Sequence, residues 1–288
     1  MLTRPQALLA VHLVAVLFGA TGILGQLITV DPTFITWGRA GFAVCALAVF
    51  GRFLLEQPIH ALLHHGKWAA LLGSGATLTV HWVTFFMSVK VGGIAIATLG
   101  FASFPAFISV IEWGLLREPV TRAEWLRVGL VSVGLLLVTP SFDLTNMGTE
   151  GLLWGLFSGA SFGVLAVINR RSLSGVNAFA VAGLQNAIVF LLLSPWIWYE
   201  APRVSVVNWL WVALLGVVCT GLAHFLFVSS LRQLPARTAG LVVALEPIYA
   251  IAFAWLLFSQ VPSPRMMLGA AIMIATIASA SFAMQKTR

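Results

Sequence analysis

Apolar segments about 20 residues long recur along the whole chain, separated by short polar breaks, and this pattern most constrains the fold. A helix of about 20 apolar residues spans the hydrocarbon core of a bilayer. The pattern predicts an all-α integral membrane protein with ten transmembrane helices, at residues 6–29, 33–54, 67–89, 93–116, 123–140, 149–169, 177–199, 207–231, 236–258 and 265–285. The breaks are too short to hold a soluble domain, so the chemistry must take place in or beside the bilayer.

The composition agrees with lipid as the outer solvent. Hydrophobic residues make up 60% of the chain and charged residues 9%, against about 45–50% and 25% in soluble domains. The net charge of +7 does not predict nucleic-acid binding, because the basic residues stand singly or in pairs between the apolar segments. Cys45 and Cys219 lie inside apolar segments, which argues against a disulfide framework.

The distribution of Lys and Arg predicts the orientation. If the N-terminus, the even-numbered loops and the C-terminus share one face, that face carries twelve of the sixteen basic residues. The other face carries Lys90, Arg203 and Arg265, and Arg39 lies inside the second predicted helix. Short basic loops stay on the cytoplasmic side. We therefore expect a multi-pass protein of the plasma membrane (the bacterial inner membrane) with both termini in the cytoplasm.

An internal repeat divides the chain. A shift of 142 positions lays the third to fifth predicted helices over the eighth to tenth without a gap, so that Ser88 meets Ser230 and Pro105 meets Pro247. We expect two repeated halves, residues 1–141 and 149–288, with five helices each. Because five is odd, the second half crosses the membrane upside down. Inverted repeats that meet near the midplane are a frequent transporter plan.

Short motifs in both halves carry a family resemblance. They lie at residues 17–21, 104–107 and 116–119 of the first half, and at 245–249 and 255–258 of the second. In this pattern and order the chain resembles the EamA-type drug/metabolite transporter superfamily, although Gln260 stands where the first half has Glu118. The resemblance implies a secondary transporter that exports small metabolites by alternating access. Within the superfamily the chain looks most like the exporters of aromatic amino acids and methionine.

Arg39, Glu112 and Glu246 are the three acidic or basic candidates inside the predicted spans, where charge is expensive and usually faces a cavity. Glu246 falls near mid-depth, far from either surface, and needs a cavity to supply water. Arg39 lies about 10 Å from the outer boundary at a rise of about 1.5 Å per residue. Its alternative role is to extend its long side chain outward toward Asp31. Glu112 lies near the cytoplasmic end and could instead reach water directly.

Polar groups at mid-depth complete the predicted site. His81 and Trp82 are adjacent in the third predicted helix, and the repeat shift places His224 opposite Trp82. Asn186 lies in the seventh predicted helix. We expect His81, Trp82, Asn186 and Glu246 to line a midplane substrate site, with Arg39 above it. The alternatives are a histidine bonded to a neighbouring helix and a tryptophan that anchors the chain at the interface.

Proline and glycine patterns predict how the helices move and pack. Pro105 and Pro247 superpose under the repeat shift and fall inside long apolar segments, so a kink at each predicts paired hinges; the alternative is a static packing kink. Glycines recur every fourth residue in the sixth predicted helix, at positions 151, 155, 159 and 163. Small residues at this spacing let another helix approach closely.

An intramembrane enzyme and a channel are the competing classes of function. The chain carries no metalloprotease helix motif, no nucleophile turn, no phosphate-binding loop and no selectivity-filter sequence. His60, His64 and His65 have spacing that could suit a metal, but a fourth ligand is missing, and an interfacial turn is the preferred interpretation. We expect a small-molecule substrate, no cofactor and no metal. The substrate, the coupling ion and the oligomeric state stay open.

Overall fold

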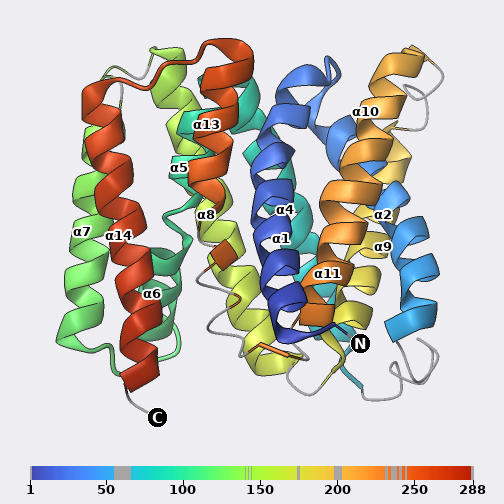
Figure 1. Ribbon diagram of the computed structural model, residues 1–288, viewed down its shortest axis with the longest axis horizontal. Helices are drawn as coiled ribbons and strands as arrows, with labels where there is room; N and C mark the ends of the chain where they lie inside the picture. The colour runs from blue at the N-terminus through green and yellow to red at the C-terminus, as the bar shows by residue number, and fades with distance from the viewer. Residues whose placement is uncertain are drawn as a thin grey trace.

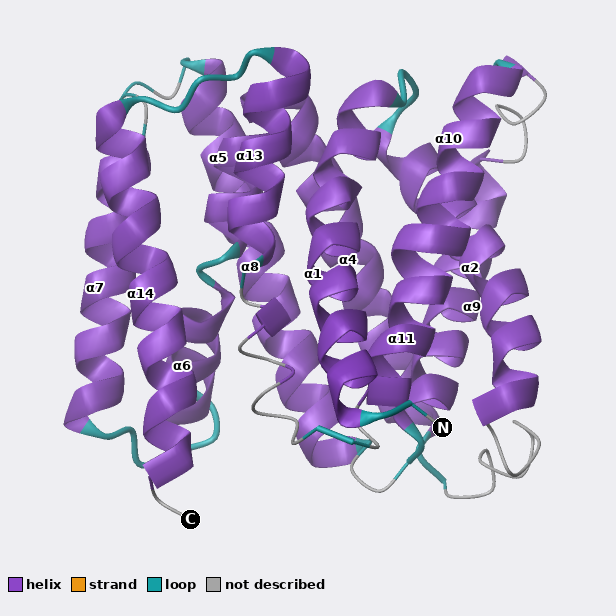
Figure 2. Cartoon of the chain, in the orientation of Figure 1, coloured by secondary structure: helices purple, strands orange, loops and turns teal. Residues whose placement is uncertain are grey.

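The computed structural model describes residues 2–54, 66–139, 141, 143, 145–173, 176–197, 203–230, 233–234, 239, 242–243 and 245–286. Within these residues every regular element is a helix (Figure 2), which confirms the all-α class. The predicted histidine turn at positions 60–65 lies outside the described residues. So does most of the stretch between 231 and 245.

The helices follow the predicted segments in order. The first half contains α1 (Arg4–Leu27), α2 (Pro32–Leu54), α4 (Trp68–Gly92), α5 (Ile94–Phe101), α6 (Phe104–Gly114) and α7 (Arg122–Val138). The second half contains α8 (Met147–Ser172), α9 (Ala178–Ile197), α10 (Val206–Gly216), the π-helix η3 (Val217–Leu222), α11 (Ala223–Ser230), α13 (Glu246–Phe258) and α14 (Pro264–Lys286).

Seven described stretches are long and apolar enough to cross a membrane. They are Arg4–Leu27, Pro32–Gly51, Trp68–Gly92, Ile94–Gly114, Met147–Ser172, Ala178–Ile197 and Val206–Ser230. The apolar parts of α13 and α14 are shorter, and α7 has 17 residues. The predicted count of ten spans therefore stays a prediction.

Polar residues mark where helices begin. Thr3 and Gln6 form a capping box at the start of α1, in which the Thr3 backbone N–H donates to Gln6 Oε1 at 2.8 Å. Thr121 and Glu124 form the same motif at the start of α7. Asn146 caps α8 by accepting from the backbone of the first turn. Each cap satisfies N–H groups that the helix itself leaves without partners, so the polar breaks of the sequence become sharp helix starts.

The two halves run in opposite senses. α1 begins and α14 ends at the same end of the molecule, and the first helices of the two halves, α1 and α8, run in opposite directions (Figure 1). α1 packs against α11 and α13 of the other half, and α8 packs against α4, α5 and α6. α2 packs against α9, and α7 against α14. Equivalent helices therefore make equivalent contacts, as an inverted repeat requires.

The glycine face of α8 allows close packing against the first half. A Cβ on Gly151 would lie 2.4 Å from the Gly92 Cα, and one on Gly155 would lie 3.2 Å from the Gly100 Cα. Further along, a Cβ on Gly159 would lie 2.8 Å from Ser103 Oγ. The predicted close approach of another helix is confirmed, and α8 lies directly against the α4–α5–α6 run.

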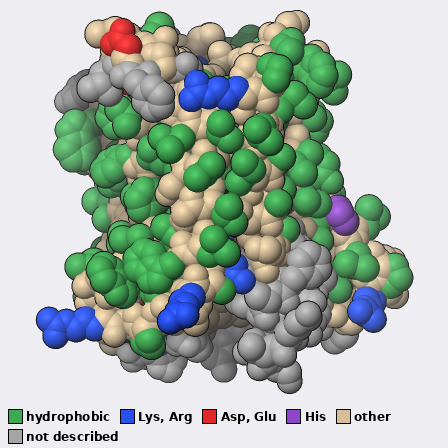
Figure 3. Space-filling model, turned by 90° about the vertical axis from the view of Figure 1, so that its left-hand side faces the viewer, with side chains coloured by type: hydrophobic (Ala, Val, Ile, Leu, Met, Phe, Trp, Pro, Cys, Tyr) green, Lys and Arg blue, Asp and Glu red, His purple; other side chains and the backbone are tan. Residues whose placement is uncertain are grey.

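The outer surface is apolar between its ends. Figure 3 looks onto the side formed by α7 and α14, where Lys and Arg side chains gather toward the two ends of the face. Large hydrophobic side chains on these helices are well exposed, among them Leu126, Leu136 and Leu268. Such an exposed face suits lipid, because water would make it an aggregation surface.

Candidate functional site

Two helix breaks lie at equivalent places in the two halves. The fourth predicted segment is interrupted after α5 at Ala102 and Ser103, and α6 starts at Phe104. In the second half α13 starts at Glu246 after a turn at Leu245. Ser103 has φ −72° and ψ −10°, and Leu245 has φ −80° and ψ −6°. Ser103 and Leu245 therefore share one backbone conformation.

The hydrogen bonds around the breaks repeat as well. Ser103 N donates to Gly100 O at 3.2 Å and Leu245 N donates to Val242 O at 3.1 Å. The carbonyl oxygens of Ser103 and Leu245 accept the first backbone hydrogen bonds of the helices that follow them. Every member of this set is related by the shift of 142 positions that the sequence predicts.

The prolines occupy a different position from the one expected. The sequence suggests a proline inside a continuous helix, where it would cost a hydrogen bond. Pro105 is instead the second residue of α6, and Pro247 the second residue of α13. The first N–H groups of a helix have no intrahelical partner, so proline is well suited to this position. The prolines begin new helices at the breaks; their action as hinges stays a prediction.

The far ends of α6 and α13 match in the same way. Arg117 and Ser259, 142 positions apart, are the described non-glycine residues with positive φ, at 53° and 55°. The next residue in each case donates a backbone hydrogen bond to the carbonyl six residues earlier. Glu118 N donates to Glu112 O at 2.9 Å, and Gln260 N donates to Ala254 O at 3.2 Å. Each helix end is therefore marked by a residue in the left-handed (αL) conformation. The two helix ends lie at opposite ends of the molecule (Figure 1).

Arg39 is buried between α2, α4 and η3. Its side chain points across to the second half, where Nε and Nη2 donate to Thr220 Oγ1 at 3.1 and 2.7 Å. The guanidinium Cζ lies 4.0 Å from the centroid of the Trp82 ring, in a cation–π contact. Arg39 is only 5% exposed, and Asp31 accepts from the Thr33 backbone instead. The structure thus favours the interior role over the outward one.

Thr220 was not among the sequence candidates. It lies in η3, a π-helical turn, and its hydroxyl donates to Leu215 O, five residues earlier, at 3.1 Å. The same oxygen accepts the two N–H groups of Arg39. A Cβ on Gly216 would lie 2.6 Å from Arg39 O, so η3 and α2 are in backbone contact here. Single π-turns inside helices occur often at functional sites.

His81 and Trp82 face different neighbours. His81 Nδ1 lies 2.8 Å from Ser158 Oγ, and that hydroxyl lies 3.0 Å from His81 O. The imidazole centroid lies 5.0 Å from those of Phe101 and Phe162. His81 thus bonds to a neighbouring helix, as the alternative interpretation held, and it also lines an aromatic cluster beside the first helix break. Trp82 lies under Arg39 and is buried, not at an interface.

Asn186 is buried in α9, and only one end of its side-chain amide has a hydrogen-bond partner. Its Nδ2 donates back to Ala182 O at 2.8 Å, while Oδ1 is buried without a hydrogen-bond partner. Buried polar atoms normally find a partner, so Oδ1 is available to a ligand or water. Val189, one turn further on, packs in the same cluster as Trp82. No described contact joins Asn186 to Arg39 or His81.

Glu246 begins α13 near mid-depth. Among the described residues its carboxylate makes no hydrogen bond and no ion pair, and its electrostatic partner is Arg39. A Cβ on Gly19 would lie 3.2 Å from Glu246 O, which places the start of α13 directly on α1. Arg39 and Trp82 are in contact, and Glu246 is linked to them through its electrostatic interaction with Arg39.

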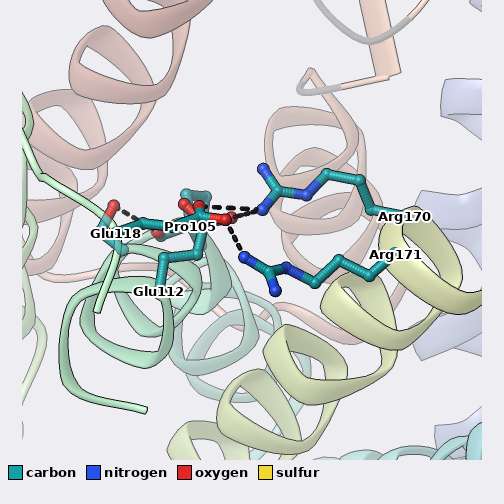
Figure 4. Close-up of polar contacts among 6 residues, drawn as sticks. Pro105, Glu112, Glu118, Arg170 and Arg171 are labelled. Carbon is teal, nitrogen blue, oxygen red and sulfur yellow. Dashed lines mark hydrogen bonds and ion pairs between the residues drawn. The ribbon is translucent and has the colours of Figure 1, made fainter. Parts of the chain in front are cut away.

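A cluster of ion pairs joins the two halves at the end that carries the termini (Figure 4). Arg170 Nη2 lies 2.7 Å from Glu112 Oε1 and 3.2 Å from Glu118 Oε2, and Arg171 also pairs with Glu118. The arginines lie in the last turn of α8, Glu112 lies near the end of α6, and Glu118 follows α6. Glu112 therefore has a partner in the protein and does not simply reach water.

A small cavity of about 140 Å³ lies between α6, α7 and α14. Its lining includes Pro105, Ser109, Glu124, Arg127 and Thr276. None of the predicted substrate residues lines it, so this cavity is distinct from the Arg39 neighbourhood.

The fold defines a membrane protein built from two matched halves that meet around buried polar groups, and sequence comparison agrees. The model of the EamA-like transporter family matches residues 5–139 and again residues 149–282. The chain therefore belongs to the EamA-like transporter family. Substrate identity does not follow from this match.

Relatives in bacteria cover nearly the whole chain. The uncharacterized transporter YwfM of Bacillus subtilis is 24% identical and covers 97% of this chain and 95% of its own length. Protein RarD of Streptomyces exfoliatus is 25% identical, with 90% and 85% covered. One crystal structure matches 99% of this chain and all of its own at 19% identity and a TM-score of 0.65, which supports the fold alone.

Proposed function

We propose that this protein is a secondary transporter that exports small amphipathic metabolites, amino acids with aromatic or thioether side chains in particular, by alternating access. The observation that carries the proposal is the pair of matched helix breaks in two halves of opposite sense. Discontinuous helices of this kind lie beside midplane substrate sites in transporters with inverted repeats. The ten-span topology and the cytoplasmic position of both termini belong to the proposal.

The charges and aromatic rings of the predicted site suit an amino acid. Arg39 and Glu246 supply one charge of each sign, as a solute that carries a carboxylate and an ammonium group requires. Phe101, Phe104 and Phe162 form a contiguous aromatic cluster, with centroid separations of 5.0–5.3 Å. Aromatic and thioether side chains pack favourably on such rings. His81, Trp82 and Asn186 complete the proposed substrate-binding set.

Uptake into proteoliposomes made with the purified protein tests the function. A panel of amino acids is offered with and without a pH gradient, and we expect accumulation or counterflow of aromatic amino acids and methionine. Trp82→Ala and Asn186→Ala should impair uptake without lowering expression. Transport of no panel member, with the reconstituted protein folded, would reject the amino-acid proposal.

Reporter fusions test the topology. We expect fusions at both termini and at Arg122 to report the cytoplasm, and a fusion at Asp143 to report the outside, because basic loops stay inside. Termini on opposite faces would contradict an even number of spans.

A further inference from the structure

The Arg39 guanidinium has N–H groups that Thr220 does not take. A guanidinium has five N–H groups, and Thr220 takes one from Nε and one from Nη2. The N–H groups of Nη1 have no hydrogen-bond partner among the described residues. The ion pairs among the described residues all involve Arg170 or Arg171, so no carboxylate lies within ion-pair distance of Arg39, and Glu246 acts on it only from further away. A buried charge without a counter-ion in direct contact is costly, and an anion from the solute would complete the site.

The surroundings fix which edge of the guanidinium stays open. One edge, Nε and Nη2, is held by the single oxygen of Thr220. One face of the guanidinium lies on Trp82, because its Cζ is 4.0 Å from the centroid of that ring. The same atom lies 5.6 Å from the centroid of the Phe86 ring. The edge that includes Nη1 is left, and it has the geometry to meet both oxygens of a carboxylate.

Thr220 is itself held in place. Its hydroxyl proton goes to Leu215 O through the π-turn, so the oxygen presents its lone pairs to Arg39. Thr220 is fully buried. His224 Nδ1 also lies 2.9 Å from Thr220 O, which fixes the backbone of the same residue. Without this anchor the guanidinium could turn its open edge away from the site.

We propose that Arg39 is the anion subsite, which binds the carboxylate of the transported solute, and that Thr220 is the positioning residue that keeps the Nη1 edge free for it. The inference rests on the proposed function and adds a residue and a ligand group to it. It requires the solute to carry a carboxylate, and it explains why an arginine is kept inside a membrane span. Lys at position 39 would keep the charge but lose the fork that Thr220 orients.

The test measures uptake of a phenylalanine analogue pair by reconstituted full-length protein. The pair is phenylalanine and phenylalaninamide, which differ in the carboxylate alone. Thr220→Val removes the oxygen that Arg39 needs, and Thr220→Ser keeps it. Thr98→Val is the matched control, because Thr98 is buried and its hydroxyl donates only to Ile94 O of its own helix.

We expect Thr220→Val to raise the KM for phenylalanine about tenfold, the equivalent of one charge-assisted hydrogen bond, with little change in maximal rate. The KM for phenylalaninamide should not change. Thr220→Ser should restore phenylalanine uptake to within about threefold, and Arg39→Lys should lose the preference for the carboxylate. Thr98→Val should match the wild-type protein.

Each outcome bears on one proposal. If the wild-type protein transports neither compound nor any other panel member, the amino-acid function is wrong. If it transports phenylalanine but Thr220→Val and Arg39→Lys keep the wild-type preference for the acid over the amide, the anion subsite is wrong and the function stands. Should Thr220→Val fail to fold, Arg39→Lys decides alone. Equal inhibition of phenylalanine uptake by phenylalaninamide and by phenylalanine in the wild-type protein would also overturn the subsite.

Discussion

The ion-pair cluster predicts a measurable bias between access states. Glu118 in the first half pairs with Arg170 and Arg171 in the second half, at the end that carries the termini. Its repeat counterpart, Gln260, is neutral, and its Oε1 accepts only a long 3.4 Å bond from the Ile94 backbone. Glu118→Gln therefore gives the two ends the same side chain. We expect this substitution to favour opening at the end that carries the termini.

The size of the shift follows from the exposure of the pairs. The Glu118 side chain is 36% exposed, and those of Arg171 and Arg170 are 42% and 53% exposed. Exposed ion pairs contribute about 0.2–1 kcal/mol each, so two pairs at the middle of that range contribute about 1 kcal/mol. Since about 1.4 kcal/mol is a factor of ten in an equilibrium constant, the open population should rise about fivefold. High salt should reproduce part of the effect in the wild-type protein, because exposed charges are screened.

Cysteine accessibility measures this population. On a background without Cys45 and Cys219, Val167→Cys places a reporter in the last half of α8, where Val167 is buried. A membrane-impermeant maleimide is applied from the side of the termini, and Glu118→Gln should label about fivefold faster. Glu150→Gln is the matched control, because Glu150 is in the first turn of α8 and accepts from Trp154 Nε1. Equal labelling rates in Glu118→Gln and the control, at low and high salt, would refute the reasoning.

Three further predictions concern the breaks, the packing and the central carboxylate. Pro105→Ala and Pro247→Ala should shift cysteine labelling in opposite directions, since the halves are inverted; shifts of one sign would contradict the symmetric mechanism. Gly159→Leu should lower the free energy of unfolding by about 1–3 kcal/mol through overpacking, whereas Gly183→Leu, whose Cβ would meet open space, should be tolerated in a detergent melt. Glu246→Gln should raise the KM for counterflow of an amino acid, because it removes the negative charge proposed to face the ammonium group, and it should abolish any stimulation of uptake by a pH gradient, since a buried carboxylate is the group expected to carry a proton; an unchanged KM and unchanged stimulation would assign both roles elsewhere.

The sequence was sufficient for the all-α class and for the 142-residue shift at the described breaks, whereas the count of ten spans stays a prediction. Apolar length and short breaks decide both, and the hydrogen bonds around Ser103 and Leu245 follow the predicted shift. The geometry of the breaks was less accessible, because a proline in the middle of an apolar segment does not reveal whether it kinks one helix or starts another. The pairing of Glu112 with Arg170 was missed since the two are far apart in sequence.

Thr220 could not be singled out for a physical reason. A threonine inside an apolar helix usually bonds to the preceding turn of its own helix, and many others here do so. Its role depends on a π-turn that brings one oxygen to Leu215 and Arg39 together, and local residue preferences do not encode that turn. Asn186 also bonds within its own helix, since its Nδ2 donates to Ala182 O, and only Oδ1 stays without a hydrogen-bond partner.

The symmetry of the backbone contrasts with the asymmetry of the chemistry. The breaks at Ser103 and Leu245 match across the halves, and so do the residues with positive φ at Arg117 and Ser259, as two equivalent gates of the proposed alternating-access mechanism require. A solute with one carboxylate and one ammonium group has a direction, however, and a symmetric site would bind it in two opposed ways. The repeat shift places His224 where the first half has Trp82, and only Trp82 carries an arginine on its face. Thr220 contacts both side chains: its hydroxyl accepts from Arg39, and its carbonyl oxygen lies against the His224 ring. In the proposed mechanism side chains orient the solute while the matched backbone moves it. Substitutions at Thr220 should therefore change which solutes are accepted, whereas substitutions at the breaks should change how fast either gate opens.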